Sequence, residues 1–489
     1  MSRVPIIDVG QKLEAERKPP ALHVSDPTPV PDRAVHAEIA LTDLFSVCAP
    51  EFSAVNRIDP YWDGIWASGS SEASWVSRSL AERQVDAGLG LMPENFKMSR
   101  DEALASVAAT YRWRTKLKML GALDTWRTLS GEQLAAVVGD RAIMSSKSKL
   151  IASLFCSELI DVGVFHNMLL PVDKRERSNL FRPSRSRTFV NDIEPLLTYP
   201  EWVSITGGTP AQAGGLYDRH NLLASELGLR IAEFCEVGSV IGEKHTTVDL
   251  LAGSGLGLNV PDPDHRRADL AVLRPDGLRV AIEITASSSY GFSKKVRRWA
   301  EILQERPLEM SGLTILFVLA ASPERENSKG FHERTQMYKT IAKAVREFPG
   351  RPGDRTARRM GVVSWRDWFP SKGTASADFE NMRAYFPTGP RDDLWHRADL
   401  LGVNGLPMKP KNPEAIQAAV HQSHLLLGVP HWLRDASKSP QVWPVLLDRA
   451  GITNIPMIPP AIPKDPRRVL GQPSGKAMAT KPPERMIIS

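Results

Sequence analysis

The chain has 489 residues, of which 42% are hydrophobic and 24% are charged, and these values exclude a chain that is disordered throughout. Its longest uninterrupted apolar run, residues 315–321, is far shorter than the roughly 20 residues that a bilayer-spanning helix needs, so we expect no membrane span. The first residues lack the apolar core of a secretory signal, and the three cysteines are too widely spaced for a disulfide framework or a zinc site. We therefore expect a cytoplasmic protein with reduced cysteines.

Proline-rich segments without hydrophobic periodicity occupy both ends of the chain. We predict a flexible arm over residues 1–38 and a basic, disordered tail over residues 456–489, and these tails could mediate a homodimer or contact a partner protein. Between them, residues 40–198 have mainly helical patterns, residues 199–370 alternate between helix and strand patterns, and residues 371–455 predict short helices of unknown role. The expected fold class is a multidomain α/β protein.

Positive charge is clustered along the chain, although the formal net charge is only +6. Residues 171–189 hold six Lys or Arg against two acids, and residues 464–485 have the same ratio. Four more basic residues lie between positions 294 and 298, and of these Arg297 and Arg298 are candidate DNA contacts. A single basic run is often only a solvated surface, but three runs favour a polyanionic partner, for which double-stranded DNA is our prediction.

The helical region contains a pattern that is typical of a winged helix-turn-helix module. After a long helix over residues 102–120, a short capped helix over 129–138 ends at Gly139, and a second helix follows over 145–159. A strand over 160–165 then enters the basic loop. This order predicts a winged helix-turn-helix over about residues 120–190, and the alternative is an ordinary helical hairpin with a basic loop.

In the winged-helix interpretation the second helix lies in the major groove of DNA. Lys147 and Lys149 near its start would contact phosphates or base edges. Arg182, Arg185 and Arg187, which we place in the wing, would contact the DNA backbone.

The region 199–370 has the patterns of a mixed sheet covered by helices. The expected elements, in chain order, are a helix over 220–234, strands over 268–273 and 278–284, a helix with Ser293 as its N-cap, a strand over 313–320, a helix over 333–348 and a strand over 360–364. The turn Arg274-Pro-Asp-Gly277 has the composition of a tight hairpin, so the first two strands should pair.

Two acidic residues of this hairpin are candidate metal ligands and catalytic residues. Asp269 and Glu283 are 14 residues apart, and a hairpin of this length can bring both carboxylates together. Two carboxylates and a backbone carbonyl would form a hard-oxygen site for Mg²⁺, which can activate water and stabilise the charge of an attacked phosphate. The alternative is that Asp269 is an exposed strand residue and Glu283 pairs with Arg267 or Arg279.

This arrangement resembles the PD-(D/E)xK nuclease superfamily, in which an acidic helix residue precedes an Asp on one strand and Glu-x-Lys on the next. Asp269 and Glu283 match the two strand acids, and Glu226 or Glu233 would supply the helix acid. Thr285 stands where the superfamily has its lysine. The resemblance implies that the catalytic lysine would instead be Lys294 or Lys295, at the start of the next helix.

Taken together, the two motifs are similar to the replication-relaxation family of plasmid and integrative-element proteins, over about residues 120–345. The resemblance implies a DNA-binding protein of a bacterial mobile element or prophage that acts in replication or mobilisation, with a nuclease-like domain that Thr285 makes inactive or weak. One alternative is a Mg²⁺-dependent endonuclease using Asp269 and Glu283. Another is an interaction protein whose basic arms bind an acidic partner protein.

The remaining motifs predict no small-molecule cofactor. The glycines in Gly253-Ser-Gly255-Leu-Gly257 are out of register for a dinucleotide-binding loop. His220, His245 and His265 lack metal-ligand spacing, so we assign them no role.

Overall fold

The computed structural model describes most of the chain between residues 29 and 434. The described ranges are 29–31, 37–63, 65–66, 72–145, 148–165, 179–215, 217–246, 267–328, 332–388, 392–402, 404–408, 420 and 423–434. The predicted tail over 456–489, nearly all of the arm over 1–38 and the candidate DNA contact Lys147 lie outside them. Within these ranges, no helix is both long and apolar enough to cross a membrane.

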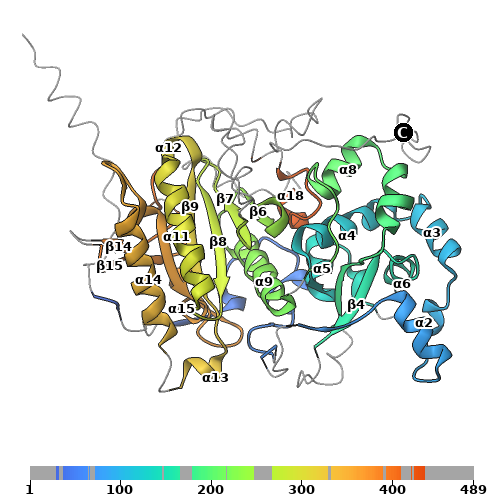
Figure 1. The fold of residues 1–489 in the computed structure, drawn as a ribbon. Coiled ribbons are helices and arrows are strands. Elements are labelled where there is room, and N and C mark those ends of the chain that lie inside the picture. The colour runs from blue at the N-terminus through green and yellow to red at the C-terminus, as the bar shows by residue number, and fades with distance from the viewer. Residues whose placement is uncertain are drawn as a thin grey trace, which may run out of the picture.

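The structure is a mixed α/β fold built around a seven-stranded sheet (Figure 1). The strands, in spatial order, are β15 (Leu394–Ala398), β14 (Ala384–Thr388), β12 (Met360–Ser364), β9 (Leu313–Leu319), β8 (Arg279–Thr285), β7 (Leu270–Leu273) and β6 (Ser239–Gly242). β8, β9 and β12 are parallel, and the other neighbours pair antiparallel. Every residue of β9 is buried, which explains the uninterrupted apolar run of this strand.

Helices connect and cover the strands of this sheet. α11 (Tyr290–Glu305) links β8 to β9, and α14 (Glu333–Glu347) lies beside α11 (Figure 1). α9 (Asp218–Phe234) precedes β6 and packs against β6, β7 and β8. The predicted hairpin between β7 and β8 is confirmed, and Gly277 allows its turn because φ is +100° there.

The N-terminal part combines helices with a four-stranded antiparallel sheet in the order β2-β4-β5-β3. Its elements are β2 (Ser74–Val76), α2 (Arg78–Asp86), α3 (Arg100–Ala108), α4 (Trp113–Trp126), β3 (Leu129–Ser130), α5 (Gly131–Val138), α6 (Lys149–Cys156), β4 (Ile160–Val164), β5 (Leu180–Pro183) and α8 (Tyr199–Thr206). A reciprocal capping box between Ser130 and Gln133 starts α5, and Gly139 ends it with φ +81°. The predicted short capped helix is therefore confirmed.

Three helix boundaries differ from the predictions. The helix expected over 102–120 is two helices, α3 and α4, because the chain turns at Arg112 with φ 56°. α6 begins at Lys149, since a 3₁₀ turn occupies residues 141–144. The N-cap of α11 is Ser289 rather than Ser293, and its hydroxyl accepts a hydrogen bond from Phe292 N.

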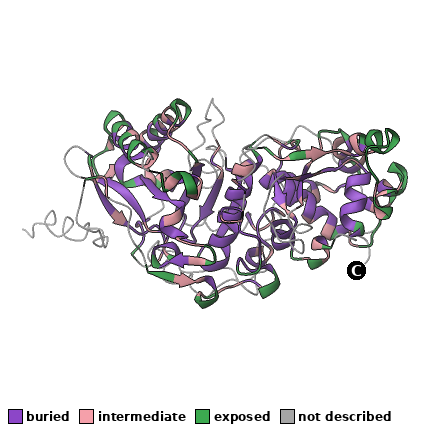
Figure 2. Ribbon diagram, turned by 90° about the horizontal axis from the view of Figure 1, so that it is seen from below, coloured by how far each residue is buried: buried purple, intermediate pink, exposed green. Residues whose placement is uncertain are grey.

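The region 371–455 is not the separate helical region that we predicted. Where it is described, it adds β14 and β15 to the large sheet, and β13 (Thr374–Ser376) pairs with β1 (Glu38–Ala40). α18 (His431–Arg434) joins both parts of the molecule, because His431 Nδ1 contacts Ala136 O at 2.7 Å and Trp432 Nε1 donates to Ala232 O at 2.8 Å. One continuous apolar core accordingly extends through both parts (Figure 2).

Candidate active site beside strands β7 and β8 of the large sheet

The β7–β8 hairpin holds the Asp269 carboxylate against the next strand. Asp269 directly precedes β7, and its backbone N–H donates to Ile282 O at 2.9 Å, which extends the ladder by one residue. The backbone N–H of Ile284 in turn donates to Asp269 Oδ2 at 2.6 Å. The Asp269 carboxylate therefore lies beside the residue that follows Glu283.

Glu283 is buried in the middle of β8, with 1% of its side chain exposed. Two residues of α11 hold its carboxylate: Lys295 Nζ lies 2.6 Å from Oε2, and Trp299 Nε1 donates to Oε1 at 2.6 Å. Lys295 and Trp299 are four residues apart on a helix, so both side chains project from the same face. The first three turns of α11 thus supply both donors.

His220 is the residue of α9 that reaches this site, and sequence reasoning set it aside. Its Nε2 lies 2.8 Å from Asp269 Oδ1, and its side chain is 32% exposed. The only signal in the sequence was its position in the first turn of a predicted helix, because the contact depends on where that helix ends against the sheet.

Burial and charge give the two carboxyl groups different acidities. Burial and the negative charge of Asp269 raise the pKa of the Glu283 carboxyl to about 7. Burial opposes ionisation of Asp269 too, but the positive charges of His220 and Lys295 and the Ile284 N–H hold its pKa below the ordinary value. For His220, burial favours the neutral ring, and the Asp269 carboxylate outweighs this and raises its pKa.

The two carboxylates fit the ligand preference of Mg²⁺ without forming a complete ligand cage. Carboxylate oxygens are its usual protein ligands, and mutual repulsion between Asp269 and Glu283 would be relieved by a divalent cation. Each of the four oxygens already accepts a hydrogen bond or ion pair from the protein, yet each has a second lone pair. Among the described residues, no group of three or more His, Cys, Asp or Glu side chains is arranged to hold a metal.

Glu226 and Glu233, the candidates for the helix acid, are not brought to Asp269, and the structure corrects this prediction. Glu226 Oε1 lies 3.0 Å from both Arg57 Nη2 and Arg230 Nε. Glu233 Oε2 lies 3.4 Å from Arg57 Nη1. All of these side chains are buried, so these acids belong to an internal ion-pair network that joins α9 to residues 52–59.

The other residues of the nuclease-like pattern, Thr285, Lys294 and Lys295, differ in whether they contact the two carboxylates. Thr285 turns its hydroxyl to Ser287 O at 2.8 Å and contributes its backbone carbonyl to Ala320 N at 2.7 Å. Lys294 is exposed, and no contact between it and Glu283 is found in the described part of the chain. Lys295 alone of the two lysines therefore lies at the carboxylates.

The residues that we predicted to contact DNA differ from the prediction in their burial and in their position relative to the β4–β5 loop. Arg182 is buried rather than available, because its Nε lies 3.2 Å from Asp161 Oδ2 and its guanidinium stacks 4.2 Å from the Trp75 ring centroid. Arg185 and Arg187 are exposed but follow β5, so they are not in the β4–β5 loop, of which residues 166–178 lie outside the described ranges. Lys149 is exposed at the start of α6.

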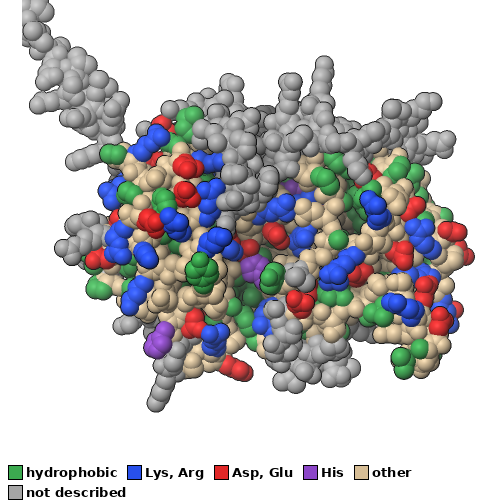
Figure 3. Space-filling view, viewed as in Figure 1, with side chains coloured by type: hydrophobic (Ala, Val, Ile, Leu, Met, Phe, Trp, Pro, Cys, Tyr) green, Lys and Arg blue, Asp and Glu red, His purple; other side chains and the backbone are tan. Residues whose placement is uncertain are grey.

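Arg297 and Arg298 of α11, the candidate DNA contacts on this helix, have acidic partners. Arg297 lies 2.8 Å from Glu347, and Arg298 lies 2.9 Å from Glu301. On the face shown in Figure 3, Lys and Arg side chains are interspersed with Asp and Glu on both halves of the molecule. Contacts with DNA by Arg297 and Arg298 would therefore require exchange of an existing ion pair.

Comparison of the chain with protein-family models, with curated proteins and with solved structures found no match. The resemblance to the replication-relaxation family accordingly stays a prediction.

Proposed function

We propose that this chain is a DNA-processing protein that docks on duplex DNA and hydrolyses a phosphodiester bond at the Asp269–Glu283 pair beside strands β7 and β8 of its large sheet. The observation that carries the proposal is the contact of Lys295 with Glu283, beside an Asp269 carboxylate held against the same strand. A lysine next to two strand acids is the residue set of the PD-(D/E)xK pattern, with the lysine supplied by the helix instead of the strand.

The order of elements supports both halves of the proposal. α9, β6, β7, β8, α11 and β9 follow one another, with β6, β7 and β8 antiparallel and β9 parallel to β8, as expected for a nuclease-like core. α4, β3, α5, α6, β4 and β5, with β5 paired to both β3 and β4, have the order expected for a winged helix. Exposed Lys149 begins the helix that would enter the major groove.

Each residue has a chemical role in this proposal. Asp269 and Glu283 would hold Mg²⁺, which supplies a polarised water and compensates phosphate charge when it is bound. Lys295 would orient water or stabilise negative charge on the phosphate, since its side chain is 34% exposed and its ammonium already lies within this site. His220 positions Asp269 through the 2.8 Å contact.

The second candidate is a DNA-binding platform that does not cleave. It is favoured by the contacts that the two carboxylates already make within the protein. All four of their oxygens accept a hydrogen bond or ion pair, from His220, Ile284, Lys295 and Trp299. In this case the polar cluster would stabilise the hairpin and α11 without binding a metal.

Nicking of supercoiled plasmid with Mg²⁺ or Mn²⁺ separates the two candidates. We expect the wild type to nick, and Asp269→Asn and Glu283→Gln to bind the same DNA on a gel without nicking it. A wild type that shifts DNA but never cuts it would support the platform. A wild type that does neither would overturn both candidates.

A further inference from the structure

A cavity of about 210 Å³ lies in the N-terminal part of the molecule, and neither Asp269 nor Glu283 lines it. Its wall is formed by α4, the turn between α6 and β4, the segment that follows β5, α8 and the loop over 211–213. The apolar part of the lining consists mainly of Leu120, Leu123, Leu159, Phe189, Val190 and Ile205. Exposed residues such as Arg187 and Ala213 line this cavity, so it opens to solvent, and an apolar cleft with few polar groups is a candidate binding site.

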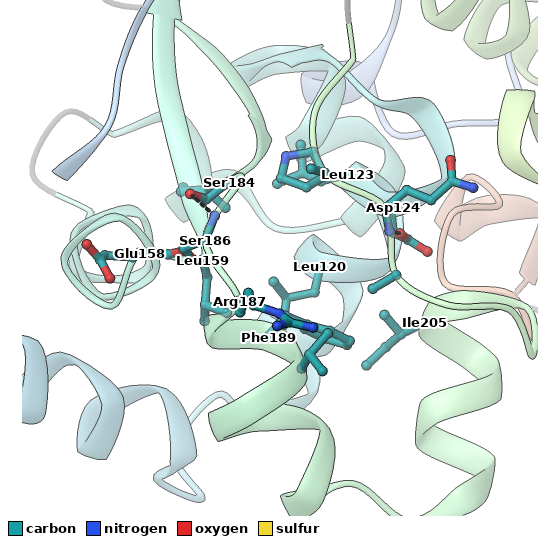
Figure 4. A pocket seen from close by; sticks show the side chains of 16 residues that line it. Leu120, Leu123, Asp124, Glu158, Leu159, Ser184, Ser186, Arg187, Phe189 and Ile205 are labelled. Carbon is teal, nitrogen blue, oxygen red and sulfur yellow. Dashed lines mark hydrogen bonds between the residues drawn. The ribbon is translucent and has the colours of Figure 1, made fainter. Parts of the chain in front are cut away.

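Charge around this cavity is unbalanced. The Asp124 carboxylate is satisfied by Lys244 and by the backbone N–H of Gln212, which lies 3.0 Å from Oδ1. Glu158 pairs with Arg100 at 3.5 Å, and Figure 4 shows its carboxylate directed away from the other lining side chains. The acids of the wall are therefore compensated from outside the cavity.

Among the described residues that line the cavity, Arg187 is the basic one. Figure 4 shows its side chain extending among the lining residues, next to Leu120 and Phe189. Within the described residues, its guanidinium has no hydrogen bond or ion pair. A guanidinium beside an apolar floor attracts a group that is anionic at one end and apolar over the rest.

We infer that this cavity binds a small monocarboxylic acid with an apolar body. A carboxylate matches the planar guanidinium in geometry, and one uncompensated cation matches one negative charge better than a doubly charged phosphate monoester. The volume is below the roughly 300–1,000 Å³ of pockets for drug-sized ligands, so the apolar body is small, about six to eight carbons. This site is independent of the proposed cleavage of DNA.

Calorimetric titration of the full chain with octanoate, and with 1-octanol as its uncharged analogue, tests this inference in the absence of DNA. We expect saturable binding of one octanoate, at least about tenfold tighter than 1-octanol, because only the carboxylate can form a charge-assisted hydrogen bond with Arg187. Arg187→Gln should remove this preference for the acid. Arg185→Gln is the matched control, since Arg185 is an exposed arginine two residues away that does not line this cavity, and it should retain the preference.

A second variant tests the location without disturbing the core. Ala213 is an exposed lining residue, and Ala213→Trp should fill the opening and abolish binding of both ligands. Absence of saturable octanoate binding to the wild type would overturn the inference. Binding that survives Ala213→Trp, or that has the same acid preference in Arg187→Gln, would overturn it as well.

Discussion

Lys295 Nζ lies 2.6 Å from Glu283 Oε2, although the lysine belongs to α11 and the glutamate to the strand before it. Thr285, at the lysine position of the nuclease-like pattern, has no ammonium group. Lys295 brings one to Glu283 from the helix instead. A charged group next to two carboxylates can stabilise the transition state of phosphate attack, and loss of such a group typically lowers kcat by about 10²–10³.

Lys295→Met should therefore lower plasmid nicking by at least about 100-fold while leaving DNA binding intact. Lys294→Met is the matched control, because Lys294 is exposed on the same helix turn and should nick at the wild-type rate. The measurement is the rate of nicking of supercoiled plasmid with Mg²⁺, taken from a time course for the wild type and for each variant. Equal nicking by both variants would remove Lys295 from the catalytic site.

Local sequence pattern was sufficient to predict much of the structure around Asp269 and Glu283. The apolar run over 315–321 predicts a buried strand or helix, and the glycine at position 277 marks the hairpin that brings Asp269 beside β8. Lys295 was a candidate because it follows β8 closely in the chain. These contacts all lie within about 26 residues of one another, where turn chemistry fixes geometry.

Contacts between distant segments were not predictable in the same way. His220 meets Asp269 across 49 residues, and only the packing of α9 against β7 and β8 brings its first turn there. Glu226 is on the same helix but faces Arg57, a residue from the start of the chain that no local pattern connects with it. β14 and β15 lie in the region 371–455, for which the sequence predicts short helices, because short strands at a sheet edge carry little periodicity.

The network around Glu226 should act on stability rather than on chemistry. Glu226→Gln leaves Arg57 and Arg230 buried without their shared carboxylate, and breaking a buried pair by removing one partner costs about 3–5 kcal/mol. We expect a lower midpoint of urea unfolding, with nicking per folded molecule unchanged. A variant of wild-type stability that has lost nicking would instead return Glu226 to the active site.

The raised pKa of Glu283 predicts a pH-dependent stability difference between the wild type and Glu283→Gln. The pKa is about 7 in the folded chain against an ordinary value of 4.5, so folding favours the protonated form. The contribution of this carboxyl to stability is full below pH 4.5 and is lost as pH rises through 7. The glutamine side chain does not titrate. The free energy of unfolding of the variant, relative to that of the wild type, should therefore rise by up to roughly 3 kcal/mol between pH 5 and pH 8.

Urea unfolding of both proteins at pH 5, 6, 7 and 8 measures this difference without Mg²⁺. Subtraction of the two curves removes the titration of shared groups that do not interact with Glu283. A difference that is constant with pH would show that Lys295 and Trp299 keep the carboxylate ionised throughout.

Substitution by alanine should affect DNA binding at Lys149 and protein stability at Arg182. Lys149 is exposed at the start of α6, so Lys149→Ala should weaken DNA binding and flatten the plot of log K against log salt by about 0.9 for one lost phosphate contact. Arg182 is buried between Asp161 and Trp75, so Arg182→Ala should cost about 1–3 kcal/mol of stability and leave that slope unchanged. Fluorescence anisotropy of labelled duplex DNA between 50 and about 200 mM salt measures the slopes. A slope changed by Arg182→Ala and not by Lys149→Ala would argue against docking through α6 and for the wing contact first predicted for Arg182.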